Sequence, residues 1–96
     1  MFHNKNEFTK SIELFNESAM KGIVESQFML ASVYHLGNGK PQNYRLAYIW
    51  YSIAAASGDA DAVQMRDMVS EQLDAKTLSE AQKEAAEIFE SIRGNE

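Results

Sequence analysis

The feature that most constrains the fold of this chain is an internal repeat. When the sequence is shifted by 36 positions, the distance from Leu14 to Trp50, large residues fall on large residues and small on small, without a gap. The matched pairs are Phe8 with Tyr44, Ser11 with Ala47, Leu14 with Trp50, Phe15 with Tyr51, Ser18 with Ala54, Ala19 with Ala55, Gly22 with Gly58, and Ser26 with Ala62. A period of this length is typical of stacked helical repeats.

Each repeat unit is predicted to be a pair of helices. In the second unit, apolar and small residues from 47 to 58 recur at i, i+3, i+4 and i+7, which is the spacing of one helical face. Gly58 stands where a helix needs a left-handed C-terminal residue, and Asp59 is suited to cap the helix that follows. The units are placed at about residues 6–36 and 44–73 within a single domain, 1–96.

The linker at 37–43 and the end of the chain carry their own signals. Gly37 and Gly39 allow positive φ, Pro41 forbids a helix, and Asn43 is a candidate N-cap. Thr77 with Glu80 forms a capping-box pattern that opens a last helix at about 77–93. One stripe of that helix is apolar: Leu78, Ala81, Ala85, Ile88, Phe89 and Ile92. The fold class is therefore all-α, an α/α superhelix of two helix pairs and a C-terminal capping helix.

The second unit mixes very large and very small side chains in one helix. Ala47, Ala54 and Ala55 leave hollows, whereas Trp50 and Tyr51 are large enough to enter hollows on neighbouring helices. Helices approach closely where a small side chain faces a large one. This mixture indicates the packing of a helical solenoid.

These residues resemble the Sel-one-like repeat (SLR), a relative of the tetratricopeptide repeat. The matching positions are Ala47, Trp50, Tyr51, Ala54, Ala55, Gly58 and Ala62, and, around the linker, Leu30, Ala31, Tyr34, Gly37, Gly39, Lys40 and Asn43. Ala31, Lys40 and Asn43 depart from the family's usual Gly, Val and Asp. The resemblance implies a TPR-like adaptor for protein binding with no catalytic residues to carry over. Its bacterial members include signalling adaptors, regulators of envelope processes and immunity-type partners of secreted toxins.

Composition excludes several function classes. A net charge of −5 works against nucleic acid as a partner, and the absence of Cys removes thiolate metal sites. The only imidazoles are His3 and His35, too few for a zinc site or a catalytic triad; we expect His35 to meet carbonyls at a helix end. We expect no catalytic, cofactor or metal site, no enzyme activity and no membrane insertion. The predicted location is cytoplasmic, or periplasmic or secreted if a signal peptide has been removed.

A protein or peptide partner is predicted to bind where the two units differ, since residues that follow the repeat are used for stacking. The residues assigned to stacking are Leu14, Phe15, Ala19, Trp50, Tyr51, Ala54 and Ala55. The predicted partner-binding residues, on the inner face of the first helix of each pair, are Glu13, Asn16, Glu17, Met20, Arg45, Tyr48, Ile49, Ser52 and Ile53. Tyr48 and Arg45 are residue types common at binding hot spots, Met20 is an adaptable contact, and Glu13 and Glu17 would steer a basic segment.

The first helix of the second unit leaves two interpretations open. Leu46, Ile49 and Ile53 extend its apolar surface around most of the circumference, and Tyr48 extends it on the other side. Such a helix is either buried among several neighbours, or it exposes Tyr48, Ile49 and Ile53 as an apolar strip. An exposed strip would also allow an alternative function, a self-associating structural domain that forms a homodimer. The family resemblance implies a second alternative, an immunity-type partner of a toxin.

Overall fold

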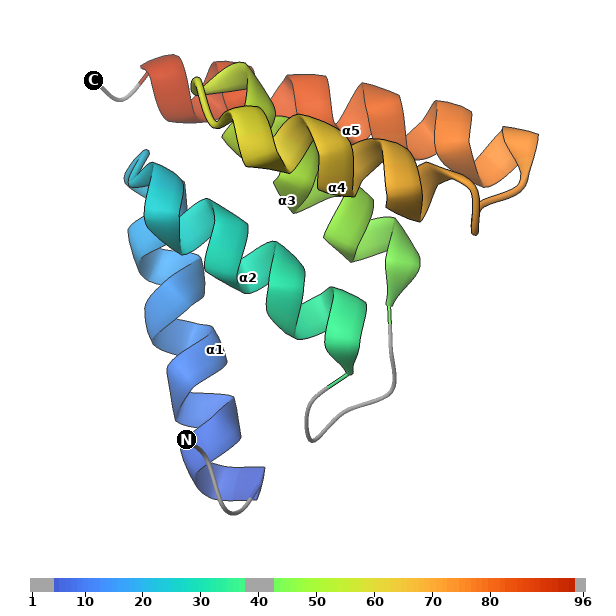
Figure 1. The fold of residues 1–96 in the computed structure, drawn as a ribbon. Coiled ribbons are helices and arrows are strands. Elements are labelled where there is room, and N and C mark those ends of the chain that lie inside the picture. Colours follow the sequence, from blue (N-terminus) through green and yellow to red (C-terminus); the bar gives the residue numbers. More distant parts are fainter. Residues whose placement is uncertain (1–4, 38–42, 95–96) are drawn as a thin grey trace.

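The computed structural model describes residues 5–37 and 43–94, with side chains described from residue 12 onward, and over this part of the chain it is all-α (Figure 1). The helices are α1 (Lys5–Met20), α2 (Val24–Leu36), α3 (Tyr44–Ala56), α4 (Ala60–Ser70) and α5 (Ala75–Gly94). α2 packs along α1, α3 along α2 and α4 along α3, as expected for two helix pairs, and α5 packs on α3 rather than along α4. No helix in the described residues is both long and apolar enough to cross a membrane. Gly39 and Pro41 of the linker, and His3, lie outside the described residues.

The repeat extends to the backbone of the turns inside each pair. Gly22 has φ +91° and Gly58 has φ +110°, a region that residues with a side chain rarely adopt. At both turns the amide that follows the glycine reaches back into the preceding helix: Ile23 N donates to Ser18 O at 3.2 Å, and Asp59 N donates to Ala54 O at 3.1 Å. Ser18 and Ala54 are themselves a matched pair of the 36-residue shift. The predicted left-handed residue at Gly58 is confirmed.

Replacing Gly58 with valine is expected to destabilise the domain through the backbone alone. A Cβ at Gly58 would meet no atom within 4 Å, so the cost is the strain of placing a β-branched residue at φ +110°, about 2 kcal/mol or more. Gly94→Val is the matched control, because its Cβ also enters open space and its φ is not positive. Urea unfolding should show the loss for Gly58→Val and a change within about 0.5 kcal/mol for Gly94→Val. Equal losses would show that the turn does not require a positive φ.

Two of the predicted helix caps are confirmed. Asn43 precedes α3, and its Oδ1 accepts a hydrogen bond from the amide of Leu46 at 3.0 Å. Asp59 precedes α4, and its Oδ1 accepts from the amides of Asp61 at 2.9 Å and Ala62 at 3.2 Å. Both side chains satisfy amides that have no partner within the helix.

The predicted cap of the last helix is wrong by one turn. α5 begins at Ala75, so Thr77 lies inside the helix and its amide donates to Asp74 Oδ1 at 2.7 Å. Asp74 is therefore the residue that caps α5. The hydrogen bonds that its carboxylate accepts from Thr77 lower the pKa of Asp74. Asp74 and Thr77 are both good capping residues three positions apart, so local sequence alone supports either start.

α3 forms the centre of the domain, and α2, α4 and α5 all pack against it. Its side chains are buried around most of its circumference: Ala47, Tyr48, Ile49, Trp50, Tyr51, Ile53 and Ala54 are all core residues. Of the two interpretations of this helix, burial among several neighbours is the one that the structure shows. Trp50 is only 5% exposed, as its role in packing requires.

The contact between α2 and α3 is built around Tyr51. Its ring meets the edge of Phe28 at a centroid distance of 5.4 Å, and its hydroxyl lies 3.2 Å from Ser32 Oγ and 3.3 Å from His35 Nδ1. Burial raises the pKa of the Tyr51 hydroxyl, because the charged form would lose its hydration. His35 thus contacts the side chain of Tyr51, whereas the sequence suggested the helix-end carbonyls.

A buried glutamine joins the two repeat units. Gln27 is fully buried; its Nε2 donates to Ala19 O at 3.1 Å, and its Oε1 accepts from Ser57 Oγ at 3.2 Å. Ala19 lies near the end of α1 and Ser57 directly follows α3, so one side chain links the ends of the first helices of both pairs. Because both of its polar ends are paired, Gln27 can be buried at little cost.

The assignment of Leu14 to the core is wrong. Leu14 is 65% exposed, although its repeat partner Trp50 is 5% exposed. The difference follows from position in the array: among the described residues, α1 packs closely on α2 alone, whereas α3 is covered by three helices. Repeat-equivalent residues therefore have different burial because the first helix has fewer neighbours.

Candidate binding groove

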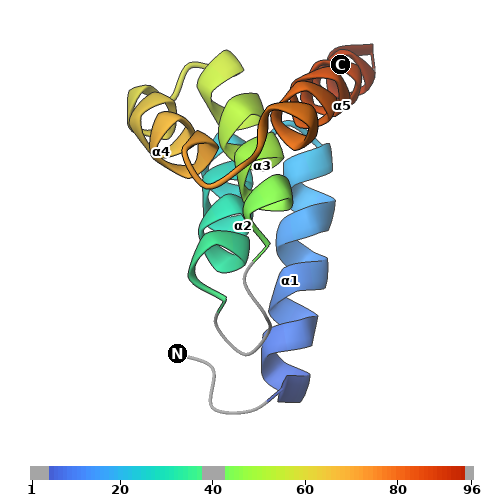
Figure 2. The same cartoon turned by 90° about the vertical axis from the view of Figure 1, so that its right-hand side faces the viewer.

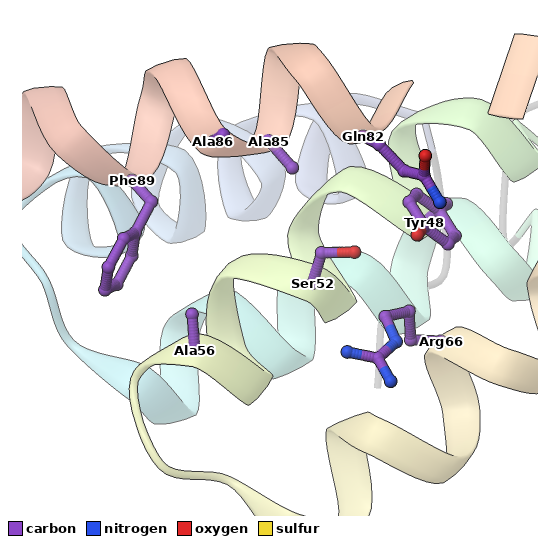
Figure 3. A pocket seen from close by; sticks show the side chains of 8 residues that line it. All are labelled: Tyr48, Ser52, Ala56, Arg66, Gln82, Ala85, Ala86 and Phe89. Carbon is purple, nitrogen blue, oxygen red and sulfur yellow. The ribbon is translucent and has the colours of Figure 1, made fainter. Parts of the chain in front are cut away.

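An open groove lies over α3, between α4 and α5. Both α4 and α5 pack on α3 but not closely on each other, and Figure 2 shows them diverging on either side of it. The groove has a volume of about 300 Å³, and its lining residues, shown in Figure 3, are Tyr48, Ser52, Ala56, Arg66, Gln82, Ala85, Ala86 and Phe89. α3 supplies the floor, Arg66 of α4 one wall, and the α5 residues the other.

The polar and apolar lining residues occupy different ends of the groove. Tyr48, Gln82 and Arg66 gather at one end, and Ala56 and Phe89 lie at the other (Figure 3). Tyr48, Ser52 and Ala56 follow one another at intervals of four residues along α3, and so they line one helical face. At 1.5 Å per residue the floor is about 12 Å long. This length corresponds to roughly four residues of extended chain.

Ser52 lies in the middle of the floor, and its hydroxyl has no partner. The Oγ atom is shielded from solvent, yet no hydrogen-bond donor or acceptor of the described chain reaches it. A buried hydroxyl without a partner costs about 1–3 kcal/mol, so an isolated case calls for an explanation. Here the residue lines a groove that a ligand could fill, while its Oγ atom is covered just beneath the groove surface.

Arg66 is the charged residue of the lining. Its Nε and Nη2 atoms both donate to Asp67 Oδ1 at 3.1 Å, and its side chain is 31% exposed while that of Asp67 is 67% exposed. None of the eight lining residues is a carboxylate. Arg66 is thus the one charged side chain among the eight lining residues, in a chain whose net charge is −5, and its present partner Asp67 lies outside the lining.

Two of the predicted partner-binding residues, Tyr48 and Ser52, line this groove. Tyr48 is only 6% exposed, so most of its ring is part of the core. Ile49 and Ile53 are each 1% exposed, which corrects the expectation that they could form an exposed apolar strip. α2, α4 and α5 surround α3, and their packing covers both side chains.

The other predicted binding residues lie elsewhere. The guanidinium of Arg45 forms an ion pair with Glu84, and this pair connects α3 with α5. Glu13, Asn16, Glu17 and Met20 are exposed on α1 and do not line the groove. Glu17 forms an exposed ion pair with Lys21, with 3.5 Å between Oε1 and Nζ.

The sequence did not identify Arg66, Gln82 or Phe89 as candidate binding residues. Phe89 was included in the apolar stripe of the last helix, but the stripe indicated only packing. No local pattern relates Arg66 to Phe89. Both line the same groove only because of the angles at which α4 and α5 pack on α3. Within the described part of the chain, no group of His, Asp and Glu residues is arranged to hold a metal ion.

In a comparison with protein families, residues 24–59 match the model of the Sel1 repeat. The matched segment contains α2, the linker, α3 and the turn at Gly58, so it includes the floor of the groove. Sel1 repeats are generally protein-interaction modules and have no catalytic role. Comparison with curated proteins and with solved structures finds no match.

Proposed function

Because residues 24–59 form a Sel1 repeat, we propose that this domain is a protein-interaction module that binds a short segment of a partner polypeptide in the groove over α3. The observation that carries the proposal is the groove itself, whose floor contains the buried and unpaired hydroxyl of Ser52. A polypeptide carries a hydrogen-bonding group at every residue, and one such group laid along the floor would pair with the Ser52 hydroxyl once that side chain turns into the groove, because the Oγ atom is covered as it stands.

The chemistry of the lining supports binding rather than catalysis. The eight lining residues include no histidine, cysteine or carboxylate that could activate Ser52 as a nucleophile. Instead the lining combines two aromatic rings, small alanines and a few polar groups, which is the usual composition of a binding surface. Self-association, the alternative function, was expected to use Ile49 and Ile53, and both are buried.

The proposal predicts that filling the groove abolishes binding. Ala86 is an exposed residue of α5 in the groove wall, so Ala86→Trp should fill the groove without disturbing the core. Ser91 is exposed on a different face of α5, which makes Ser91→Trp the matched control. The ligands are peptides selected on the immobilised domain from a displayed library of short random linear peptides.

Titration by fluorescence anisotropy should show that Ala86→Trp weakens a selected peptide at least about tenfold, while Ser91→Trp leaves its affinity within about twofold. Thermal unfolding of both variants checks that the fold is retained. The proposal fails if the library yields no peptide above the background of a bare support. It also fails if both tryptophan variants bind equally well.

A further inference from the structure

We infer that the groove selects segments in which an acidic side chain lies a few residues from a large apolar one. The inference rests on the proposed function and specifies the chemistry of the partner at the same site. Three features of the lining carry it: a cation at one end, an unpaired hydroxyl in the middle, and an apolar surface at the other end.

The polar end favours a carboxylate. Arg66 brings a planar guanidinium to this end, and Tyr48 and Gln82 lie beside it (Figure 3). Guanidinium groups bind carboxylates through paired, charge-assisted hydrogen bonds. Because no lining residue is acidic, nothing in the groove itself would repel such a ligand.

The existing ion pair of Arg66 with Asp67 does not prevent Arg66 from binding a ligand carboxylate. Its partner Asp67 is the next residue along the helix, and the carboxylate of Asp67 is 67% exposed. Exposed pairs of this kind contribute little stability, about 0–1 kcal/mol. A ligand carboxylate bound inside the groove would be less hydrated than Asp67, and its attraction to Arg66 would be correspondingly stronger.

The other end favours a large apolar side chain. Ala56 and Ala86 are small and exposed, and next to the ring of Phe89 they leave an apolar hollow. The floor of about 12 Å separates the two ends, so the acidic and apolar residues of an extended ligand would be about four positions apart, a spacing that also points both side chains to the same face. Between them, the backbone of the ligand would pass Ser52.

The net charge of the domain makes this preference a local one. At −5 the domain as a whole repels an acidic peptide at long range, so the preference must arise from contact with Arg66. It is the reverse of the basic segment that Glu13 and Glu17 suggested. Those two residues lie on α1 and not in the lining of the groove.

The test uses the same library of random linear peptides. Selected peptides should be enriched in Asp or Glu about four positions from Phe, Leu, Met or Trp. Arg66→Gln should weaken the best of them about tenfold, and Ser52→Ala about three- to tenfold. Lys76→Gln removes an exposed cation on α5 outside the groove, with the same change of net charge as Arg66→Gln, and it should change the affinity by less than about twofold.

A charge reversal completes the test. Selection on Arg66→Glu should enrich Lys and Arg in place of Asp and Glu, provided that thermal unfolding shows this variant to be folded. The inference is overturned if peptides blocked by Ala86→Trp show no acidic preference, or if Arg66→Gln binds them as tightly as the unchanged domain; the proposed function then still stands. If no peptide is selected at all, the proposed function fails and the inference fails with it.

Discussion

Replacing Ile49 with glutamate is expected to unfold the domain. Ile49 is 1% exposed on the central helix, so the change removes a buried side chain, worth about 2–5 kcal/mol, and adds a carboxyl group with no partner. Together these losses approach the whole stability of a small domain, about 5–15 kcal/mol. Far-UV circular dichroism and urea unfolding should show an unfolded or severely weakened protein.

The matched control is the same substitution at an exposed isoleucine. Ile23 is 50% exposed and occupies the position just before α2, where a negative charge interacts favourably with the helix N-terminus. Ile23→Glu should therefore change the free energy of unfolding by less than about 1 kcal/mol. A folded Ile49→Glu variant with similar stability would mean that the helices packed on α3 do not cover Ile49.

This result matters for the interpretation of function. If Ile49 had been exposed, a charge at this position would have tested self-association by disrupting a dimer. Because Ile49 is buried, loss of activity in such a variant would report unfolding. Substitutions that test binding belong instead at groove positions outside the core, such as the exposed Ala86 and the partly exposed Arg66.

Features that depend on local interactions could be predicted from the sequence. The 36-residue shift correctly matched Gly22 with Gly58, and both have positive φ, because a tight reversal between helices requires it whatever the neighbours are. Asn43 and Asp59 were correctly identified as caps for the same reason. The error at Thr77 arose where a second capping residue, Asp74, stood one turn earlier.

Features that depend on the number of neighbours could be predicted only in part. The apolar surface around α3 was visible in the sequence, but the same pattern fits a buried helix and an exposed strip. The outcome depends on whether three other helices cover α3, which the spacing of its residues does not determine. The assignment of Leu14 to stacking was wrong for the converse reason. Leu14 follows the repeat pattern, but its helix α1 has one close neighbour among the described helices.

The groove could not be predicted, because it depends on an angle between helices. Ser52 and Tyr48 were named as binding residues, but Arg66 and Phe89 come from helices whose own patterns indicate only packing. The divergence of α4 and α5 brings these residues around Ser52. No residue spacing within either helix encodes that divergence.

Replacing Trp50 with alanine is expected to lower the free energy of unfolding by about 3–5 kcal/mol, while the same change at its repeat partner Leu14 should cost less than about 0.5 kcal/mol. Trp50 is 5% exposed and fills space between helices, whereas Leu14 is 65% exposed. Urea unfolding followed by circular dichroism gives both values without relying on tryptophan fluorescence. A loss below about 1 kcal/mol for Trp50→Ala would show that Trp50 is not part of the core and would contradict the packing of α3.

Leu14→Ala has a contradicting outcome of its own, a loss of several kcal/mol that grows with protein concentration. Such a loss would show that a second copy of the chain covers the face of α1 that carries Leu14, since folding would then be coupled to association.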